Sequence, residues 1–252
     1  MRELLKRYLS AEFRNRLRLH LPEMVFRKRS YSQCGEDLLV TFLLDLLHGE
    51  RPKRYIDVGA NHPYHLSNTA LLYSKGGSGI LIEPDPAFAR LLTKKRPRDK
   101  VQACGVHFSG EMQAAFYIFD TPTLNTFSPQ EKDRYLAMGH RLMDTLMVPL
   151  IDINSVLEMA GPVDFLNLDI EGLDEEVLRK IDWHIHRPTC LCVETISYQT
   201  RSEPQKQAQI LNYMAEQDYM LYADTFINTI FVDRRQWIKK YGPDTKDAQG
   251  PQ

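Results

Sequence analysis

The chain has 252 residues, a formal net charge of −1 and 43% hydrophobic residues. This length suits one α/β domain with an extension, and the near-neutral charge excludes an overall basic surface, so we expect no nucleic-acid partner. The cysteines have neither the spacing of zinc-ligand pairs nor that of a disulfide scaffold, so we expect free thiols in the reducing cytoplasm. No apolar stretch reaches transmembrane length, and the N-terminus lacks the apolar core of a signal peptide.

Residues 1–30 are the most basic part of the sequence, with nine lysines and arginines against three acids. Apolar residues between Leu4 and Leu17 recur at helical spacing, which predicts a basic amphipathic helix. Three interpretations stay open: an arm packed on the domain or on a second subunit, a helix that docks peripherally on an acidic membrane surface, or a disordered arm. The second would place this cytoplasmic protein at the inner face of the membrane.

The central stretch of the sequence is Tyr-Ile-Asp-Val-Gly-Ala-Asn at residues 55–61. Its β-forming residues predict the buried first strand of a parallel sheet, inside which Asp57 needs a partner. Gly59 has no Cβ and lets the backbone approach a ligand closely. The stretch therefore predicts a nucleotide-type ligand at the carboxyl end of this strand.

A second strand, residues 79–82, follows a helix that Ser67, Asn68 and Thr69 are expected to cap, and it ends at Glu83. An acid at this place, roughly twenty residues beyond the first turn, commonly holds a ribose diol. The turn after the first strand has one glycine and a proline where a dinucleotide site has G-x-G-x-x-G. Pyrophosphate binding is therefore disfavoured.

The elements that follow are predicted as a helix over residues 86–96, a third strand over 101–106 and a further strand over 114–119. We interpret the basic cluster at residues 94–98 as a solvated helix end, with contact to an anionic substrate as the alternative. Residues 120–146 show few periodic features. Such an excursion is where acceptor-binding lids usually lie.

Two later strands end on acids. Residues 148–155 lead into a short helix ending at Gly161, the fourth strand ends at Asp169, and a strand over 190–194 ends at Glu194. Because the carboxyl ends of parallel strands meet at one edge of a sheet, Asp169, Glu171 and Glu194 are expected around one cleft.

The C-terminal part is predicted as a helix over residues 203–217 and an antiparallel hairpin that pairs 219–222 with 229–233. Residues beyond Tyr241 are predicted to form a disordered tail. His184 and His186 are expected in a surface loop, with a metal or catalytic role as the alternative.

Several pieces of the sequence, in order and spacing, resemble the FkbM family of S-adenosylmethionine-dependent methyltransferases. They run from about residue 31 to 233 and are Tyr-Ser-Gln-x-Gly-Glu-Asp, Ile-Asp-Val-Gly-Ala-Asn-His-Pro, Ser-Asn-Thr, Gly-x-x-Gly-Ile-Leu-Ile-Glu-Pro, Leu-Asp-Ile-Glu-Gly and Asn-Thr-Ile-Phe-Val. The resemblance implies an α/β three-layer sandwich with a seven-stranded, mostly parallel sheet (the class I methyltransferase, Rossmann-like fold). The methyltransferase domain would then span residues 31–241, after the helical extension 1–30 and before the tail 242–252.

The function implied by the resemblance is methyl transfer from S-adenosylmethionine to an oxygen, in a sugar hydroxyl of a surface glycan or its precursor. Another small-molecule or lipid-linked acceptor is the alternative. A nicotinamide-dependent oxidoreductase and a noncatalytic S-adenosylmethionine-binding protein also stay open; neither the acceptor nor the oligomeric state follows from the residues.

The resemblance also implies a cofactor site. Asp57 and Asn61 would hold the methionine end, Glu83 the ribose hydroxyls and Cys104 the adenine edge. The residues expected at the cofactor are Gln33, Asp57, Gly59, Ala60, Asn61, Ser67, Glu83, Pro84, Cys104, Gly105 and Asp169.

Asp169 and Glu171 are the candidate catalytic residues. Either could accept the proton of the acceptor hydroxyl, or both could join Glu194 in binding a divalent cation that lowers the pKa of that hydroxyl. The alternative is structural, with Asp169 ordering the turn and Glu171 satisfying the next helix N-terminus. His62, just beyond the cofactor turn, is the next candidate base.

Overall fold

The computed structural model describes residues 22–23, 26–107, 110–197 and 205–242. The chain divides into two compact units, residues 1–30 and 31–252. The predicted amphipathic helix falls almost entirely outside the described residues, and so does the tail from residue 243. Within the described ranges, no helix has both the length and the apolar character of a membrane span.

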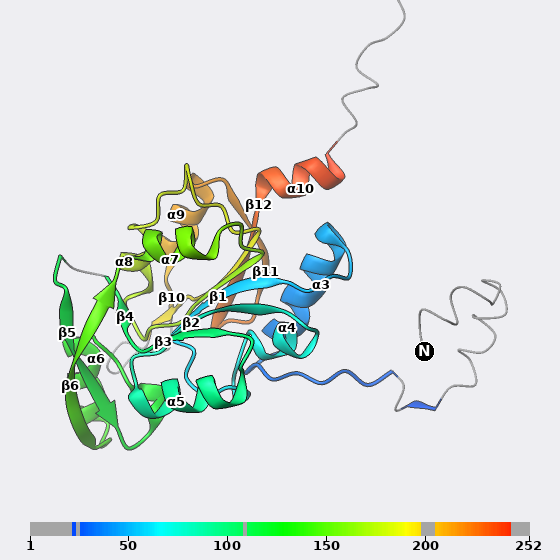
Figure 1. Cartoon of the computed structure of the whole chain (residues 1–252). Helices are drawn as coiled ribbons and strands as arrows, with labels where there is room; N and C mark the ends of the chain where they lie inside the picture. Colours follow the sequence, from blue (N-terminus) through cyan, green and yellow to red (C-terminus); the bar gives the residue numbers. More distant parts are fainter. Residues whose placement is uncertain (1–21, 24–25, 108–109, 198–204, 243–252) are drawn as a thin grey trace, which may run out of the picture. The chain divides into compact units, whose positions relative to one another are not determined.

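The second unit is built on a seven-stranded sheet in the order β11-β12-β8-β7-β1-β2-β3 (Figure 1). Strands β3, β2, β1, β7 and β8 run parallel to one another, whereas β12 is antiparallel to both of its neighbours, β8 and β11. This confirms the predicted mostly parallel sheet with an antiparallel hairpin at one edge. The bounds are β1 Arg54–Val58, β2 Ser78–Ile82, β3 Lys100–Gln102, β7 Phe165–Leu168, β8 Cys190–Glu194, β11 Tyr219–Asp224 and β12 Asn228–Asp233.

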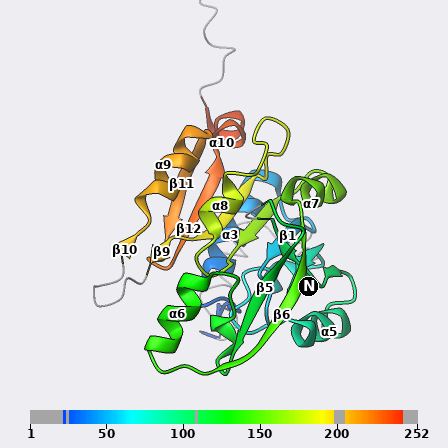
Figure 2. The ribbon, with the colours of Figure 1, turned by 90° about the vertical axis from the view of Figure 1, so that its left-hand side faces the viewer.

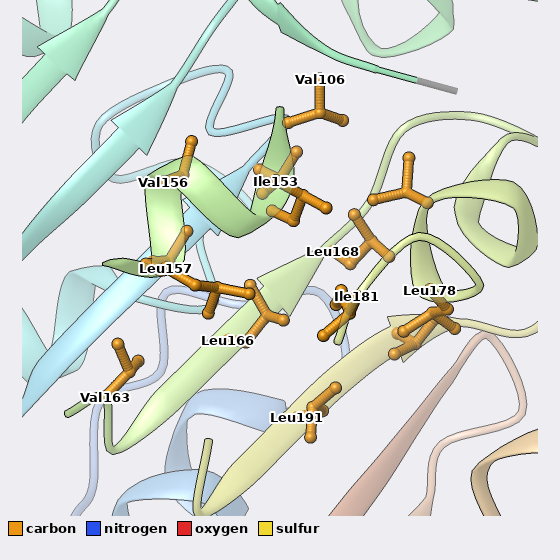
Figure 3. Packing of buried hydrophobic residues seen from close by; sticks show 14 of the residues in the cluster. Val106, Ile153, Val156, Leu157, Val163, Leu166, Leu168, Leu178, Ile181 and Leu191 are labelled. Carbon is orange, nitrogen blue, oxygen red and sulfur yellow. The ribbon is translucent and has the colours of Figure 1, made fainter. Parts of the chain in front are cut away.

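Alternation along the strands sends side chains into two cores, one on each face of the sheet. On one face, Ile56, Leu166 and Leu191 pack with helices α7, α8 and α9. Figure 3 shows this core, with Ile153 and Leu157 of α7 over the sheet. The other face packs against α3, α4 and α5. The helices are α3 Glu36–His48, α4 Ala70–Ser74, α5 Pro86–Lys95, α7 Ile153–Ala160, α8 Asp174–Leu178, α9 Ala208–Glu216 and α10 Arg234–Tyr241.

Some of the helices begin at a residue whose side chain caps the helix. Asp85 accepts a hydrogen bond from the Ala87 N–H at the start of α5, and Asp152 accepts one from the Ser155 N–H at the start of α7. At α4, Ser67 Oγ accepts from the Ala70 N–H, 3.2 Å away, whereas Thr69 at the N-cap position makes no capping bond with its side chain.

A second sheet of three strands, in the order β4-β6-β5, stands apart from the main one. It consists of β4 Gly105–Val106, β5 Gln113–Phe119 and β6 Leu142–Ile151. Between β5 and β6 lie the short helix η2 (Pro122–Leu124) and the helix α6 (Pro129–Ala137). We call residues 113–151 the cap; Figure 2 shows β5 and β6 running together with α6 beside them.

The cap corrects two predictions. The third strand does not continue over residues 101–106, because the chain leaves the main sheet after Gln102 and β4 joins the cap sheet. The excursion over residues 120–146 is also more regular than expected. Its strand β6 is exposed on most of its first half, so the sequence there lacks the apolar alternation of a half-buried strand.

The remaining elements differ from the predictions in three places. The predicted helix over residues 203–217 begins only at Ala208, because Gln205–Lys206 pair as β10 with β9 (Ile196–Ser197). Helix α10 was not predicted. Within the basic cluster, Lys94 and Lys95 are exposed as expected, but Arg96 is completely buried. His184 is exposed and His186 half-buried in a loop, as predicted.

Candidate active site

A cavity of about 360 Å³ opens at the carboxyl ends of β1, β2, β7 and β8. At this place the chain order in the sheet reverses, since β1 has β2 on one side and β7 on the other, and ligands of open α/β sheets bind there. The volume lies within the usual range for a small-molecule ligand. The predicted residues that line the cavity are Gln33, Asp57, Gly59, Ala60, Asn61, Ser67, Glu83, Pro84, Asp169, Glu171 and Glu194.

Three predicted residues do not line the cavity. Cys104 and Gly105 follow the point where the chain leaves the main sheet, and a Cβ on Gly105 would meet the Phe127 ring at 2.6 Å. His62 lies beyond the cofactor turn, where its Nδ1 accepts hydrogen bonds from the N–H groups of Tyr64 and His65. The structure therefore brings the predicted acids and the turn after β1 together at the cavity. It does not bring Cys104 and Gly105, expected at the adenine, or His62, the next candidate base, to the cavity wall.

At position 59 only glycine fits, because the backbone of the adjacent turn leaves no space for a side chain. The φ of Gly59 is +81°, and a Cβ there would lie 1.9 Å from the backbone oxygen of Asp169. From the sequence, Gly59 was expected to leave space for a ligand. In the structure, the backbone of Asp169, in the turn after β7, occupies the space that a side chain at residue 59 would need. The close approach of the two turns is what places Asp169 beside the first strand's carboxyl end.

Glu83 ties the ends of β1 and β2 together. One carboxylate oxygen accepts from the Asn61 N–H at 2.6 Å and the other from the Asp85 N–H at 2.7 Å. The side chain is 3% exposed, and burial raises its pKa to about 8. Each oxygen has lone-pair capacity left for a ligand hydroxyl, because a carboxylate accepts about four hydrogen bonds.

Asp57, 2% exposed, has the partners that its buried position requires. Its Oδ1 accepts from Asn167 Nδ2 at 2.8 Å and its Oδ2 from Thr69 Oγ1 at 2.5 Å. Burial raises the pKa of Asp57, while the Arg96 charge and these two donors act in the opposite direction. The carboxylate is thus fixed at the cavity wall.

Asp169, Glu171 and Glu194 form an acid group at the cavity, each with an oxygen within 4.8 Å of the others. Burial, with repulsion from Asp57 and Glu36, raises the pKa of Asp169 to about 6. Burial and the Asp169 charge raise the pKa of Glu171 to about 8, and they raise that of Glu194 well above its usual value. Glu171 has a left-handed backbone, φ +53°, and its Oε2 accepts from the Tyr135 hydroxyl at 2.8 Å. Such a group either holds protons or takes up a cation, and an all-oxygen donor set suits Mg²⁺, Ca²⁺ or Mn²⁺.

A fourth acid stands behind this group. Asp174, at the start of α8, is 2% exposed; its Oδ1 accepts from the Ile170 N–H, and its Oδ2 has no hydrogen-bond partner among the described residues. Burial and the Asp169 charge raise its pKa well above the usual value. An acid in the first turn of a helix is common, because the helix dipole favours negative charge there, but the closeness of Asp174 to the cavity acids does not follow from the sequence.

The cap supplies the opposite wall of the cavity, which the sequence indicated only as a region. Asn61 Nδ2 donates to the Pro122 oxygen at 3.3 Å, Asn125 Nδ2 to Asp85 Oδ2 at 3.3 Å, and Thr126 Oγ1 to the Glu171 oxygen at 3.1 Å. The signal that could have located α6 is Ser-Pro-Gln-Glu, since Ser128 Oγ accepts from the Glu131 N–H. Cap residues that line the cavity are Phe116, Pro122, Thr123, Leu124, Asn125, Thr126, Phe127, Arg134, Tyr135 and Met138.

The turn at residues 31–37 forms a third part of the wall. Asp37 Oδ2 accepts from the Tyr31 N–H at 2.7 Å, and the Tyr31 oxygen accepts from the Ser67 N–H at 3.1 Å. Glu36 accepts from the Cys34 N–H and from Asn228, which also lines the cavity. The two acids of this turn therefore shape it, and Gln33 is the residue it presents to the cavity.

The sequence matches the family model described as the methyltransferase FkbM domain over residues 57–221. Similar solved structures include a 1,6-didemethyltoxoflavin-N1-methyltransferase of Burkholderia thailandensis with bound S-adenosylhomocysteine: 10% identity, 79% of this chain and 77% of that one, TM-score 0.39. A TehB-like S-adenosylmethionine-dependent methyltransferase of Corynebacterium glutamicum has 10% identity over 88% and 96%, TM-score 0.41. Monomeric WbdD has 15% identity over 87% of this chain and 48% of its own, TM-score 0.45. No curated protein matches the sequence significantly.

Proposed function

We propose that this chain, which belongs to the FkbM methyltransferase family, methylates a hydroxyl oxygen of a sugar in a surface glycan or its precursor. The chain is an S-adenosylmethionine-dependent methyltransferase with a Rossmann-like fold. The observation that carries the choice of an oxygen acceptor is the acid group at the cavity, because a hydroxyl must lose its proton when it is methylated. Asp169, whose pKa is raised to about 6, is mostly ionised at neutral pH and can accept that proton, whereas Glu171, at about 8, becomes able to accept it at higher pH.

The cavity fits the cofactor on the main-sheet side. Glu83 would bind the two ribose hydroxyls through the lone pairs that its backbone partners leave free, and Asp57 with Asn61 would hold the methionine end. When bound, S-adenosylmethionine supplies an electrophilic methyl group. The residues of this chain then act by orienting the acceptor oxygen in line with it, a positioning effect of up to roughly 7–11 kcal/mol.

The acceptor would lie between the cap and the acid group. A neutral polyhydroxyl compound suits this space, because carboxylates accept hydrogen bonds from neighbouring hydroxyls, whereas a strongly anionic acceptor meets repulsion from Asp169, Glu171 and Glu194. Arg134, the cationic residue of the cap wall, is paired with Glu131. These features support a sugar ring over a bare phosphate or carboxylate.

The test is a screen of nucleotide sugars and glycans with a labelled methyl donor, followed by identification of the methylated atom. The proposal expects an O-methyl sugar, and Asp57→Asn as a cofactor-site control should abolish labelling. Methyl transfer to nitrogen or sulfur, or to a lipid-linked compound lacking a sugar, would contradict the acceptor class. Binding of S-adenosylhomocysteine without any transfer would support a noncatalytic role.

The acid group supports two roles that one experiment separates. If Asp169, Glu171 and Glu194 hold a divalent cation, a chelator abolishes activity and Mg²⁺ or Mn²⁺ restores it. If Asp169 or Glu171 is the base, activity is indifferent to the chelator and Asp169→Asn lowers kcat by about 100-fold or more. Near-normal turnover in both Asp169→Asn and Glu171→Gln would remove both roles.

Peripheral membrane contact through residues 1–30 is part of the proposal, supported by the basic amphipathic pattern of that segment. Binding to vesicles should then require anionic lipid and weaken with salt, because the charges are screened over roughly 10 Å at 0.1 M. Deletion of residues 1–30 should release the protein without changing cofactor affinity. Absence of vesicle binding at low salt would leave the packed or disordered arm.

A further inference from the structure

Arg96, which follows the last residue of α5, is the largest side chain among those that are completely buried. Its Nε donates to Asp99 Oδ2 at 2.7 Å, and its two terminal nitrogens donate to the Tyr55 hydroxyl and to Thr69 Oγ1, both at 3.0 Å. Its guanidinium carbon lies 5.1 Å from the centre of the Tyr73 ring. Arg96 is therefore not part of a solvated helix end, and it does not line the cavity, where an anionic substrate would contact it.

The Thr69 hydroxyl connects this guanidinium to the cavity. A guanidinium only donates hydrogen bonds, so Thr69 Oγ1 accepts from Arg96 and its single hydrogen is left for Asp57 Oδ2. The direction of the Arg96 bond is therefore fixed, and the Thr69 hydrogen goes to Asp57 Oδ2 at 2.5 Å rather than to Ser67 Oγ, which lies 3.4 Å away. Arg96, which is permanently charged, thus donates to Thr69, and Thr69 donates to Asp57.

A second chain ends on the other oxygen of the same carboxylate. Asn68 Nδ2 donates to Asn167 Oδ1 at 2.9 Å, and Asn167 Nδ2 donates to Asp57 Oδ1 at 2.8 Å. Because the Asn167 oxygen is taken by Asn68, its amide can only present a donor to Asp57. Both carboxylate oxygens of Asp57 thus accept.

The negative charges around Asp57 explain why both of its carboxylate oxygens need hydrogen-bond donors. Asp99, Glu83, Asp169 and Cys192 all interact electrostatically with this neighbourhood, and the acids disfavour a further negative charge. Asp99 is already paired with Arg96 through a bond of 2.7 Å. A carboxylate held by donors on both oxygens, buried and facing a cavity, is built to meet a cationic ligand group.

We propose that Arg96 and Thr69 are positioning residues for the cofactor: acting through Asp57, they hold a carboxylate at the cavity wall for the ammonium group of the methionine end. This inference rests on the cofactor site proposed above. It assigns no contact between Arg96 and the cofactor, and it gives the basic cluster a role that neither sequence interpretation contained.

The test compares two ligands that differ at the methionine end. S-Adenosylhomocysteine carries the amino-acid group, whereas 5′-methylthioadenosine lacks it. In Thr69→Val, which removes the hydroxyl at similar volume, calorimetry should show S-adenosylhomocysteine binding weakened about tenfold or more, as expected for a lost charge-assisted contact. Methylthioadenosine binding should stay within about twofold of wild type, because it does not use Asp57.

Two further variants make the test specific. Thr69→Ser should restore binding, and Thr69→Val should add nothing to the loss already present in Asp57→Asn, because both act on one contact. Tyr219→Phe removes a buried hydroxyl that donates to the Pro188 oxygen and should leave both ligands unaffected. If Thr69→Val does not fold, Thr69→Ala takes its place.

Equal weakening of both ligands, or losses that add fully in the double variant, would overturn the inference while leaving the cofactor site intact. Wild-type protein that binds methylthioadenosine and S-adenosylhomocysteine equally well would also overturn it. Wild-type protein that binds neither would overturn the cofactor site and this inference together.

Discussion

At the scale of single residues, Glu83 joins two tasks in one carboxylate. It holds the N–H groups of Asn61 and Asp85, and it is the proposed ribose ligand. Glu83→Gln keeps the shape but lacks the charge that Glu83 carries above its pKa of about 8, so at such a pH S-adenosylhomocysteine binding should weaken by about 1.5–3 kcal/mol, the range of a hydrogen bond to a charged group. Calorimetry measures the loss. Wild-type affinity in a folded Glu83→Gln protein would place the ribose elsewhere.

Gly59 leads to a prediction about stability. Its φ of +81° and the 1.9 Å approach of a Cβ to the Asp169 oxygen mean that Gly59→Ala must displace the turn after β7. We expect a loss of about 3 kcal/mol or more in the free energy of unfolding, measured by denaturant titration. Gly110→Ala is the matched control, because nothing lies within 4 Å of its Cβ. Equal stability of the two variants would contradict this account.

Residues at strand ends could be predicted because their roles follow from local pattern. Glu83 and Asp169 each close an apolar run, Asp57 lies one residue before the end of another, and parallel strands bring such ends together. Cys104 does not line the cavity, because the chain leaves the main sheet after Gln102; that departure depends on pairing with β6, more than forty residues away. The burial of Arg96 likewise depends on Tyr55 and Thr69, which the cluster itself does not reveal.

At the scale of elements, α6 contacts one of the proposed catalytic acids, Glu171, through a single hydroxyl. Tyr135 is 2% exposed and donates to Glu171 Oε2, so it fixes the carboxylate of a residue whose backbone is already left-handed. Tyr135→Phe should lower kcat by about tenfold and move the acid limb of the pH–rate profile upward, because the bond lowers the pKa of Glu171. Steady-state kinetics across pH checks both effects.

The control for this prediction is Tyr117→Phe in β5, which lies on the same cap without lining the cavity. It should leave kcat and the pH profile unchanged. A fall in kcat without any movement of the profile would assign Tyr135 to packing of the cap alone.

The main-sheet elements were predictable from their apolar runs and caps, and the cap elements were not. Strand β6 exposes Met143 and Met147, and α6 buries only Tyr135, so neither has the apolar face that identifies an element in sequence. What holds them is contact with other parts of the chain: β6 pairs with β4 and β5, and Tyr135 of α6 donates to Glu171. Sequence pattern therefore located the main-sheet wall of the cavity better than the cap wall.

At the scale of the whole molecule, the cavity acids couple stability to pH. Glu83 and Glu171 have pKa values raised to about 8, and Asp169 to about 6. An acid with a raised pKa in the folded state contributes stability that is complete below its unfolded value and is lost as pH rises through the folded value. The ligand-free protein should therefore become less stable between about pH 4.5 and pH 8. The carboxyls whose pKa is lowered, such as Asp45 and Asp164, act below this range.

His62 acts in the opposite direction in this range, since burial lowers its pKa and it favours the folded state as pH rises through about 6.5. Three acids outweigh this one group, so thermal unfolding of the ligand-free enzyme should show Tm falling by about 5 °C or more from pH 5 to pH 8. Glu171→Gln should flatten the slope because it removes one titrating acid, while Glu158→Gln, an exposed acid on α7, should not. A Tm that rises steadily from pH 5 to pH 8 would mean that the cavity acids are ionised in the folded protein. They would then already be balanced by a bound cation, whose removal by a chelator should restore the predicted slope.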